Sequence, residues 1–256
     1  MDYTQFKLNI YQISNIDLNC YKERQMKRRI DTFIEKNNYK EYGDFLQALR
    51  QERLLYDEFM SYITINVSEF FRNPKQWDVL RDVCTPVFLS KDRIRIWSCA
   101  CSTGEEPYSL AMLLAENFPL QDVKIIATDL DKQVLDVARQ GIYSRKDMLS
   151  VPAKYKNKYF TDIGNDKFKI SESIKKCIQF KKLNLLEDRY PKNIDLILCR
   201  NVIIYFTEKA KNELYQKMND SLNENGILFV GCTEQIVDCR KFGYDLIQSF
   251  FYKKKE

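Results

Sequence analysis

The sequence contains no histidine, and this absence excludes several classes of enzyme. Histidine is essential to Ser-His-Asp hydrolases, papain-like thiol proteases, H-E-x-x-H zinc proteases and two-histidine iron oxygenases. The chain of 256 residues therefore belongs to none of these classes. Glycine and proline are also scarce, with seven and six residues, which argues against a low-complexity or collagen-like chain.

Long apolar runs and signals for export are absent as well. No run approaches the roughly 18 apolar residues that span a bilayer, and the first residues, MDYTQFKLNIYQ, do not resemble a secretory signal. We therefore expect a cytoplasmic protein with no direct membrane insertion and with its eight cysteines reduced. Cys99 and Cys101 form a C-x-C pair without a C-x-x-C partner, so no metal site is expected. The net charge of +5 is low for a dedicated nucleic-acid binder.

The spacing of apolar residues divides the chain into two parts. Up to about residue 62, stretches such as LNCYKERQMKRRIDTFIEK place apolar side chains at helical spacing, which predicts an all-helical N-terminal domain. From about residue 93, short apolar runs alternate with longer amphipathic stretches, which is typical of a parallel sheet with helices on both faces. We place the boundary within ITINVSEFFRNPKQWDVL, which gives domains of residues 1–68 and 69–256.

Two segments break this alternation. Residues from about 160 to 182 predict a small β-subdomain, inserted before the strand that ends near Asn184. The runs NGILFVGC and YDLIQSFFYKKK have no helix between them, so they must be antiparallel, because a parallel connection needs a dozen or more residues. The expected fold class is α/β: the Rossmann-like sheet of adenosylmethionine-dependent methyltransferases, closed by an antiparallel C-terminal strand.

Candidate site residues follow the first predicted strand, since ligands of open α/β sheets bind beyond the carboxyl ends of the strands. The strand RIRIW leads into SCACSTGEEPYS, where small residues let the backbone approach a ligand. With a single glycine, this segment is not a dinucleotide fingerprint. Glu105 and Glu106 would repel phosphates but suit an amine or a sulfonium. Stabilisation of a helix N-terminus explains both acids about equally well.

Later strand ends carry further candidates. Asp129 ends VKIIATD, where an acid commonly accepts hydrogen bonds from ribose hydroxyls; capping of the next helix is the alternative, and Asp131 could also do that. Asn184 follows IQFKKLNLL and is a candidate partner for an adenine edge. Arg200 and Asn201 follow IDLILC, and a site at the strand ends accounts for them more simply than burial in the core.

Six segments in order resemble the CheR family of chemotaxis receptor methyltransferases, in its compact Bacillus-like form. They are NVSEFFRNP, WSCACSTGEEPYSLAMLL, IIATDLD, LNLL, CRNVIIYF and GILFVGCTEQI, and the resemblance covers essentially the whole chain. It implies transfer of a methyl group from S-adenosyl-L-methionine to glutamate γ-carboxylates on the cytoplasmic helical bundle of chemoreceptors. The product S-adenosyl-L-homocysteine is expected to inhibit. The resemblance also implies a cytoplasmic enzyme that is recruited to membrane receptor arrays.

The resemblance assigns roles residue by residue. Arg72 matches an arginine that reaches the reacting carboxylates, and Tyr205 matches a tyrosine of the site. From the chemistry of the reaction, we assign both residues to orienting the incoming carboxylate. Either Glu105 or Glu106 matches the acid that holds the amino group of the cofactor, and the sequence does not decide between them. The other positions that match cofactor-binding residues are Asn66, Ser68, Arg72, Asp129, Asn184, Leu185, Arg200 and Asn201.

The chain departs from the family at one motif. Many members have Gly-His-Ser-Glu where this sequence has GCTE at residues 231–234. The implied reaction tolerates this loss, because a glutamate with a pKa of about 4.3 is already ionised at pH 7 and attacks a sulfonium methyl group without a general base. Catalysis then consists of alignment and removal of water.

A basic helical face is the candidate docking surface for the receptor. Arg24, Lys27 and Arg28 are predicted to project away from the apolar side of their helix. A glutamate-rich bundle is acidic and would be attracted to them, although most charge runs are only solvated faces. We expect a monomer, because the sequence contains no heptad seam or long apolar stripe.

Two other functions remain open from the sequence. An RNA methyltransferase could use the basic helical domain, Lys181, Lys182 and residues 253–255 against phosphates. It would lack both an Asn-Pro-Pro-Tyr-like tetrad for amino methylation and the cysteine motifs for carbon methylation. A catalytically silent module that only binds the cofactor or the receptor is the second rival, and the polar chemistry retained at every matched position speaks against it.

Overall fold

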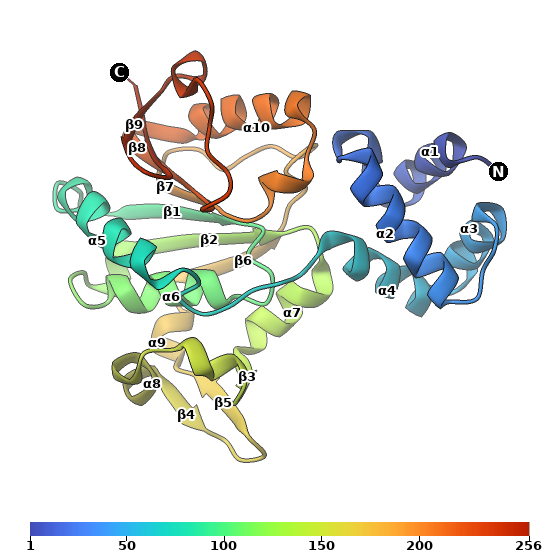
Figure 1. Cartoon of the computed structure of the whole chain (residues 1–256). Helices are drawn as coiled ribbons and strands as arrows, with labels where there is room; N and C mark the ends of the chain where they lie inside the picture. The colour runs from blue at the N-terminus through green and yellow to red at the C-terminus, as the bar shows by residue number, and fades with distance from the viewer. Residues whose placement is uncertain (256) are drawn as a thin grey trace.

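Four helices at the N-terminus pack around a core of their own (Figure 1). The computed structural model describes residues 1–255. The helices are α1 (Tyr3–Ser14), α2 (Glu23–Lys36), α3 (Tyr42–Gln51) and α4 (Arg53–Thr64), with a 3₁₀ turn η1 (Leu18–Cys20). Phe6, Phe33, Phe45 and Phe59 are buried at the centre of this bundle. The all-helical N-terminal domain is thus confirmed, whereas the boundary at residue 68 stays a prediction.

The rest of the chain forms a seven-stranded sheet in the order β6-β2-β1-β7-β8-β10-β9. Its strands are β1 (Ile94–Cys99), β2 (Val123–Asp129), β6 (Ile178–Lys182), β7 (Ile194–Cys199), β8 (Leu222–Val230), β9 (Tyr244–Gln248) and β10 (Phe251–Lys254). In this order, each strand from β6 to β8 pairs in parallel with the next one. β10 is antiparallel to both of its neighbours, β8 and β9. The predicted antiparallel C-terminal strand is confirmed. The run YDLIQSFFYKKK forms a hairpin of two strands, because the chain reverses at Ser249 and Phe250, which has a φ of 70°.

Helices cover both faces of this sheet (Figure 1). The covering helices are α5 (Pro74–Phe88), α6 (Glu105–Leu114), α7 (Lys132–Gln140) and α10 (Glu208–Ser221). Ile96 packs in the core with α5 and α6, while the adjacent Trp97 packs in the core with α10, as the alternation of side chains along a strand requires. The helix after β2 has a side-chain cap: Asp131 accepts from the backbone N–H of Gln133 at the start of α7 (2.8 Å).

The inserted subdomain differs from its expected range. Its sheet has the order β3-β5-β4, from β3 (Ile142–Ser144), β4 (Phe160–Asp162) and β5 (Lys167–Ile170). The accompanying helices are η3 (Asp147–Ser150), α8 (Ala153–Tyr159) and α9 (Glu172–Lys175). The expected range of 160–182 is wrong at both ends, since the sheet begins at residue 142 and residues 178–182 form β6 of the main sheet. β6 is an edge strand, so its exposed polar residues made it look like part of a small sheet.

The helical domain contacts the sheet at the carboxyl ends of its strands. Tyr21 and Phe206 form an isolated antiparallel bridge, and Asn184 donates to the carbonyl of Asn15 (2.9 Å). The remaining short helices are η2 (Leu120–Asp122), η4 (Ile203–Tyr205) and η5 (Cys239–Phe242). Within residues 1–255, none of the helices has the length and apolar character needed to cross a membrane.

Candidate functional site

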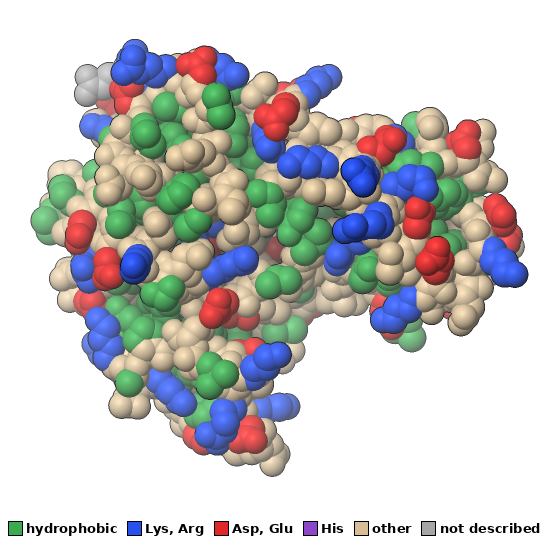
Figure 2. All heavy atoms as spheres, in the orientation of Figure 1, with side chains coloured by type: hydrophobic (Ala, Val, Ile, Leu, Met, Phe, Trp, Pro, Cys, Tyr) green, Lys and Arg blue, Asp and Glu red, His purple; other side chains and the backbone are tan. Residues whose placement is uncertain are grey.

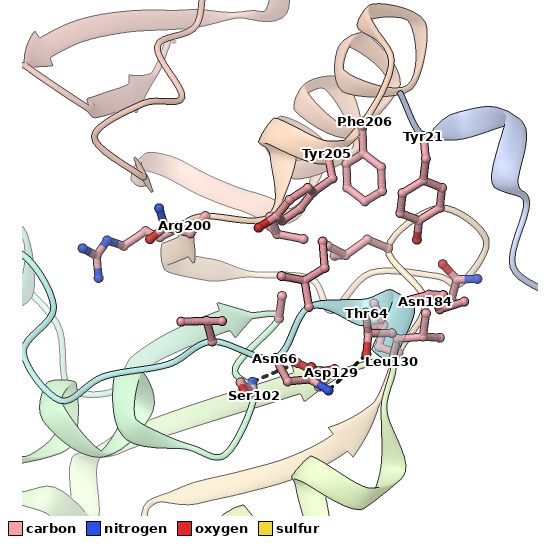
Figure 3. A pocket seen from close by; sticks show the side chains of 18 of the residues that line it. Tyr21, Thr64, Asn66, Ser102, Asp129, Leu130, Asn184, Arg200, Tyr205 and Phe206 are labelled. Atoms are coloured by element: carbon pink, nitrogen blue, oxygen red, sulfur yellow. Dashed lines mark hydrogen bonds between the residues drawn. The ribbon is translucent and has the colours of Figure 1, made fainter. Parts of the chain in front are cut away.

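A pocket lies between the helical domain and the ends of β1, β2, β6 and β7 (Figure 3). The helical domain and the segment after it contribute Tyr21, Met26 and residues 63–67, and the sheet contributes the segments that follow its strands. A smaller pocket adjoins it and shares four of its residues: Val67, Ala100, Arg200 and Asn201.

Most predicted site residues line one of these two pockets. The larger pocket is lined by Asn66, Asp129, Asn184, Leu185, Arg200, Asn201 and Tyr205. Ser68, Arg72 and Glu106 line the smaller one. Glu105 lines neither. The pockets therefore separate two acids that the sequence could not distinguish, and they place Glu106 beside the cavity.

Asp129 is a buried acid at the end of β2. Its two carboxylate oxygens accept from the backbone N–H groups of Ser102 (2.8 Å) and Asp131 (3.0 Å). Burial raises the pKa of Asp129 to about 6, against the opposing effect of these hydrogen bonds. The cap of α7 is supplied by Asp131. Capping therefore does not explain Asp129, which faces the pocket and can accept from hydroxyl groups of a ligand.

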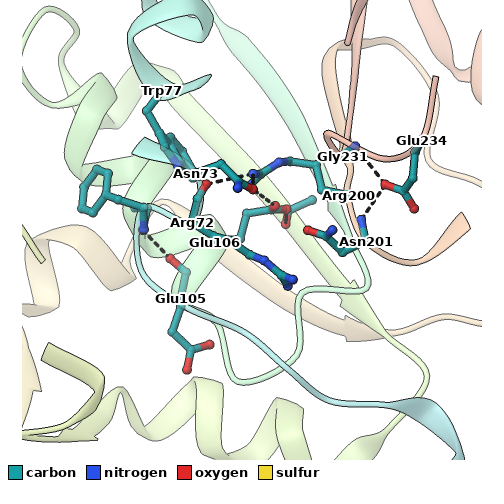
Figure 4. A network of polar contacts seen from close by, with 12 residues as sticks. Arg72, Asn73, Trp77, Glu105, Glu106, Arg200, Asn201, Gly231 and Glu234 are labelled. Atoms are coloured by element: carbon teal, nitrogen blue, oxygen red, sulfur yellow. Dashed lines mark hydrogen bonds and ion pairs between the residues drawn. The ribbon is translucent and has the colours of Figure 1, made fainter. Parts of the chain in front are cut away.

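Glu106 belongs to a network around the buried Arg200 (Figure 4). Arg200 donates to Glu106 (3.2 Å), to the carbonyl of Arg72 (2.9 Å) and to the side chain of Asn73 (3.2 Å). Ser98 also donates to Glu106 (2.8 Å). Burial raises the pKa of Glu106, and the charge of Arg200 opposes this shift. Arg200 therefore ties the segment that carries Arg72 to the start of α6.

Glu105 is held on the other side of the same turn. Its carboxylate accepts from the hydroxyl of Thr103 (2.7 Å), and burial raises the pKa of Glu105. Gly104, which precedes it, has a φ of 96°, a conformation that favours glycine. The two acids occupy successive positions in the first turn of α6, so their side chains point about 100° apart.

The side chains of Asn66 and Asn184 are used to join the two parts of the protein. Asn66 donates to Asp131 (2.8 Å), and Asn184 donates to the carbonyl of Asn15 (2.9 Å) while accepting from the backbone N–H of Leu186 (3.0 Å). Both residues still line the pocket. The sequence predicted their proximity to the site but not these contacts between domains.

Arg72 and Tyr205 differ in how they are held. The Arg72 guanidinium makes one long hydrogen bond to the carbonyl of Val67 (3.3 Å), so most of its donors remain open. Tyr205 lies in η4, and its backbone carbonyl accepts from the N–H of Lys22 (2.9 Å). Its ring lines both the larger pocket and a groove along α2. Tyr205 therefore lies where that groove meets the pocket.

The groove along α2 includes part of the predicted docking surface. It is lined by Tyr21, Lys22, Gln25, Met26, Arg28, Arg29, Thr32, Tyr62, Ile65 and Tyr205. Arg24 and Arg28 are exposed, and Figure 2 shows basic side chains gathered over this part of the molecule. Lys27 instead pairs with Asp31 (2.7 Å) and lies over the ring of Tyr3.

Sequence reasoning did not identify Tyr21 and Glu234. Figure 3 shows the Tyr21 ring at the pocket wall with its hydroxyl directed inward. Glu234 is buried behind the pocket and accepts from three backbone N–H groups. Tyr21 reaches the site only through a contact between distant segments, but Glu234 stands in the GCTE motif, which could have signalled it.

The residues present fit S-adenosyl-L-methionine. The buried carboxylate of Asp129 and the partly buried one of Glu106 line the two pockets, and such acceptors suit a cationic ligand that bears an amine and ribose hydroxyls. The hydroxyl of Tyr21 offers a further polar contact. Groups of three or more side chains able to bind a metal do not occur in the described part of the chain.

Comparisons with known proteins agree with this chemistry. Residues 1–64 match the family described as "CheR methyltransferase, all-alpha domain", and residues 66–248 match "CheR methyltransferase, SAM binding domain". A chemotaxis protein methyltransferase of Listeria innocua is 43% identical over 255 residues, which cover 99% of this chain and 97% of the relative. That of Borreliella burgdorferi is 36% identical over 262 residues, with 96% and 91% covered. An RNA methyltransferase is not favoured, and the chain belongs to the CheR methyltransferase family.

Proposed function

We propose that the protein transfers the methyl group of S-adenosyl-L-methionine to glutamate γ-carboxylates on the cytoplasmic helical bundle of chemoreceptors. The products are glutamyl methyl esters and S-adenosyl-L-homocysteine. The observation that carries this proposal is the pair of adjoining pockets, in which buried acids lie beside Arg72 and Tyr205. The acids suit the cationic cofactor, and the arginine and the tyrosine suit an incoming carboxylate.

The cofactor lies across both pockets in this proposal. Asp129 accepts from the ribose hydroxyls, Asn184 and Leu185 flank the adenine, and Glu106 accepts from the amino group, with Asn66, Ser68 and Asn201 completing the walls. We choose Glu106 over Glu105 because only Glu106 lines a pocket. Arg200 acts on the cofactor through Glu106, since three of its contacts are already made within the protein.

The receptor glutamate needs orientation more than activation. When bound, the cofactor supplies a methyl group on a positively charged sulfur. Arg72 holds one oxygen of the glutamate carboxylate while the other attacks, and the Tyr205 hydroxyl donates to the same carboxylate. A salt bridge to both oxygens would weaken the nucleophile, so Arg72 contacts one only. The reaction neutralises two charges, and a site with little water therefore favours it.

The receptor docks on α2 in this proposal. Arg24 and Arg28 are exposed, so they are free to meet an acidic helix, whereas Lys27 contributes less because Asp31 already pairs with it. The groove that leads from Arg28 to Tyr205 gives a bound glutamate a route to the pocket. Recruitment to receptor arrays and a monomeric state belong to the same proposal.

Labelled S-adenosyl-L-methionine tests the function directly. Incubation with receptor cytoplasmic fragments should give label that alkali releases as methanol, and incubation with tRNA should give none. Receptor fragments with glutamine in place of the methylated glutamates are the control and should remain unlabelled. Normal cofactor binding with no ester on any receptor would point to a silent binding module, and base-stable label on RNA would contradict the proposal.

A further inference from the structure

Glu234 is a buried carboxylate that no step above uses. It lies in the turn after β8 and is 4% exposed. One oxygen accepts from the backbone N–H groups of Asn201 (2.6 Å) and Gly231 (2.9 Å) (Figure 4). The other oxygen accepts from the backbone N–H of Ile204 (3.1 Å). Within residues 1–255, no lysine or arginine forms an ion pair with it. Backbone amides therefore satisfy this charge.

Two of those amides, from Asn201 and Ile204, belong to the turn that carries Tyr205. Asn201 has a φ of 60° and lines both pockets, and Ile204 lies in η4 beside Tyr205. Few non-glycine residues adopt a positive φ without support from their surroundings. The hydrogen bonds that Asn201 and Ile204 donate to Glu234 span residues 201–204 and so fix the direction in which Tyr205 leaves the turn.

The same turn also holds the helical domain. The carbonyl of Tyr205 accepts from the N–H of Lys22 (2.9 Å), and the N–H of Thr207 donates to the carbonyl of Cys20 (2.8 Å). A shift of residues 201–205 would therefore move Tyr205 and the attachment of the docking helix together. Glu234 lines neither pocket, so it acts on the site through the backbone groups that it holds.

Gly231 is required for this arrangement. A Cβ atom at position 231 would lie 2.4 Å from the carboxylate of Glu234 and 2.9 Å from the backbone nitrogen of Asn201. Both distances are too short for a real side chain. The spacing of glycine and glutamate in GCTE therefore serves to place a carboxylate against the turn after β7.

We propose that Glu234 is a positioning residue that fixes the 201–205 turn, and through it Asn201, Tyr205 and the contact with the helical domain. It touches neither the cofactor nor the receptor. The kinetic part of this inference rests on the proposed methyl transfer, whereas the structural part does not.

Glu234→Gln is the test, because it preserves shape and leaves one acceptor oxygen where there were two. Asp195→Asn is the matched control: Asp195 is 2% exposed at the opposite end of β7, and its carboxylate accepts from Lys91 (2.7 Å) and from the backbone N–H of Arg95 (2.9 Å). Both changes should lower stability, which thermal unfolding measures. Only Glu234→Gln should affect the turn.

Hydrogen exchange of the full-length protein decides the structural part. Peptides covering residues 200–207 should lose protection by about tenfold or more in Glu234→Gln, as expected for a lost hydrogen bond to a charged group, and stay protected in Asp195→Asn. Turnover, counted per S-adenosyl-L-homocysteine-binding site, should fall by about tenfold or more only in Glu234→Gln. Glu234→Ala should lose more exchange protection in residues 200–207 and more turnover than Glu234→Gln.

Two results would overturn the proposal. One is unchanged protection of residues 200–207 in Glu234→Gln. The other is a turnover per binding site equal to that of Asp195→Asn, which would make Glu234 a general stabiliser. If the unmodified protein forms no receptor ester, the proposed function fails, and the exchange measurement alone then decides whether Glu234 holds the turn.

Discussion

The affinity for the cofactor should depend on pH through Asp129. This carboxylate is 6% exposed and has a pKa of about 6. Removal from water is the main cause, the charge of Asp131 adds to it, and backbone hydrogen bonds oppose it. Ribose hydroxyls are donors, so they bind the ionised carboxylate better than the protonated one. Protonation of Asp129 should therefore weaken cofactor binding.

The size of the effect follows from the pKa. At pH 5, about one Asp129 in eleven is ionised, against nearly all at pH 7.5, so the dissociation constant should be about tenfold higher at pH 5, or about 1.4 kcal/mol. The effect of pH on the stability of the fold has the opposite sign to its effect on cofactor affinity. The pKa in the folded protein exceeds the unfolded value of about 3.9, so Asp129 lowers the free energy of unfolding as pH rises between these values.

Calorimetric titration with S-adenosyl-L-homocysteine at pH 5, 6 and 7.5 and constant ionic strength measures this dependence. The product is suitable because it keeps the ribose and the amino group and does not react. Asp129→Asn should bind more weakly at pH 7.5 and lose most of the pH dependence. A flat profile in the unmodified protein would refute the reasoning. If Asp129→Asn keeps the same pH dependence of the dissociation constant, that dependence would instead belong to Glu105 or Glu106, whose pKa values burial also raises.

Three further predictions concern the arginines. Arg72→Ala should lower turnover at saturating receptor by about tenfold or more with little change in melting temperature, since its side chain makes one long hydrogen bond; equal turnover would remove its role. Charge reversal of Arg24 and Arg28 should raise the receptor KM, most at low salt, and leave product affinity unchanged; an unaltered KM would contradict docking on α2. Arg200→Ala should cost about 3–5 kcal/mol in urea unfolding by leaving Glu106 buried without its cation, and Glu106→Gln should recover part of that loss.

The sequence predicted those site residues whose position follows from a local pattern of apolar and polar residues. Asp129 and Arg200 were found because apolar runs mark where parallel strands end, and those ends meet at one edge of the sheet. The choice between Glu105 and Glu106 depends on the rotation of one helix, which composition does not reveal. β6 was misassigned because an exposed edge strand resembles a strand of a small sheet.

Contacts between distant segments were beyond the reach of sequence patterns. Tyr21 reaches the pocket through its bridge to Phe206, which is 185 positions later in the chain. The amide of Asn184 likewise reaches the carbonyl of Asn15 across 169 positions. No local periodicity encodes such a pairing, and both depend on how the helical domain lies on the sheet.

The balance of buried charge favours a cationic ligand at the proposed site. Arg200 is already occupied by Glu106 and by the segment of Arg72 and Asn73, and backbone amides satisfy Glu234. Within residues 1–255, Asp129 forms no ion pair, and its pKa remains raised despite two backbone hydrogen bonds. A phosphate would add negative charge beside it, whereas a sulfonium and an amine would relieve the cost of its ionisation. The same acids would repel a receptor glutamate. In the proposed reaction, the bound cation and Arg72 are therefore expected to offset this repulsion before the receptor carboxylate can approach.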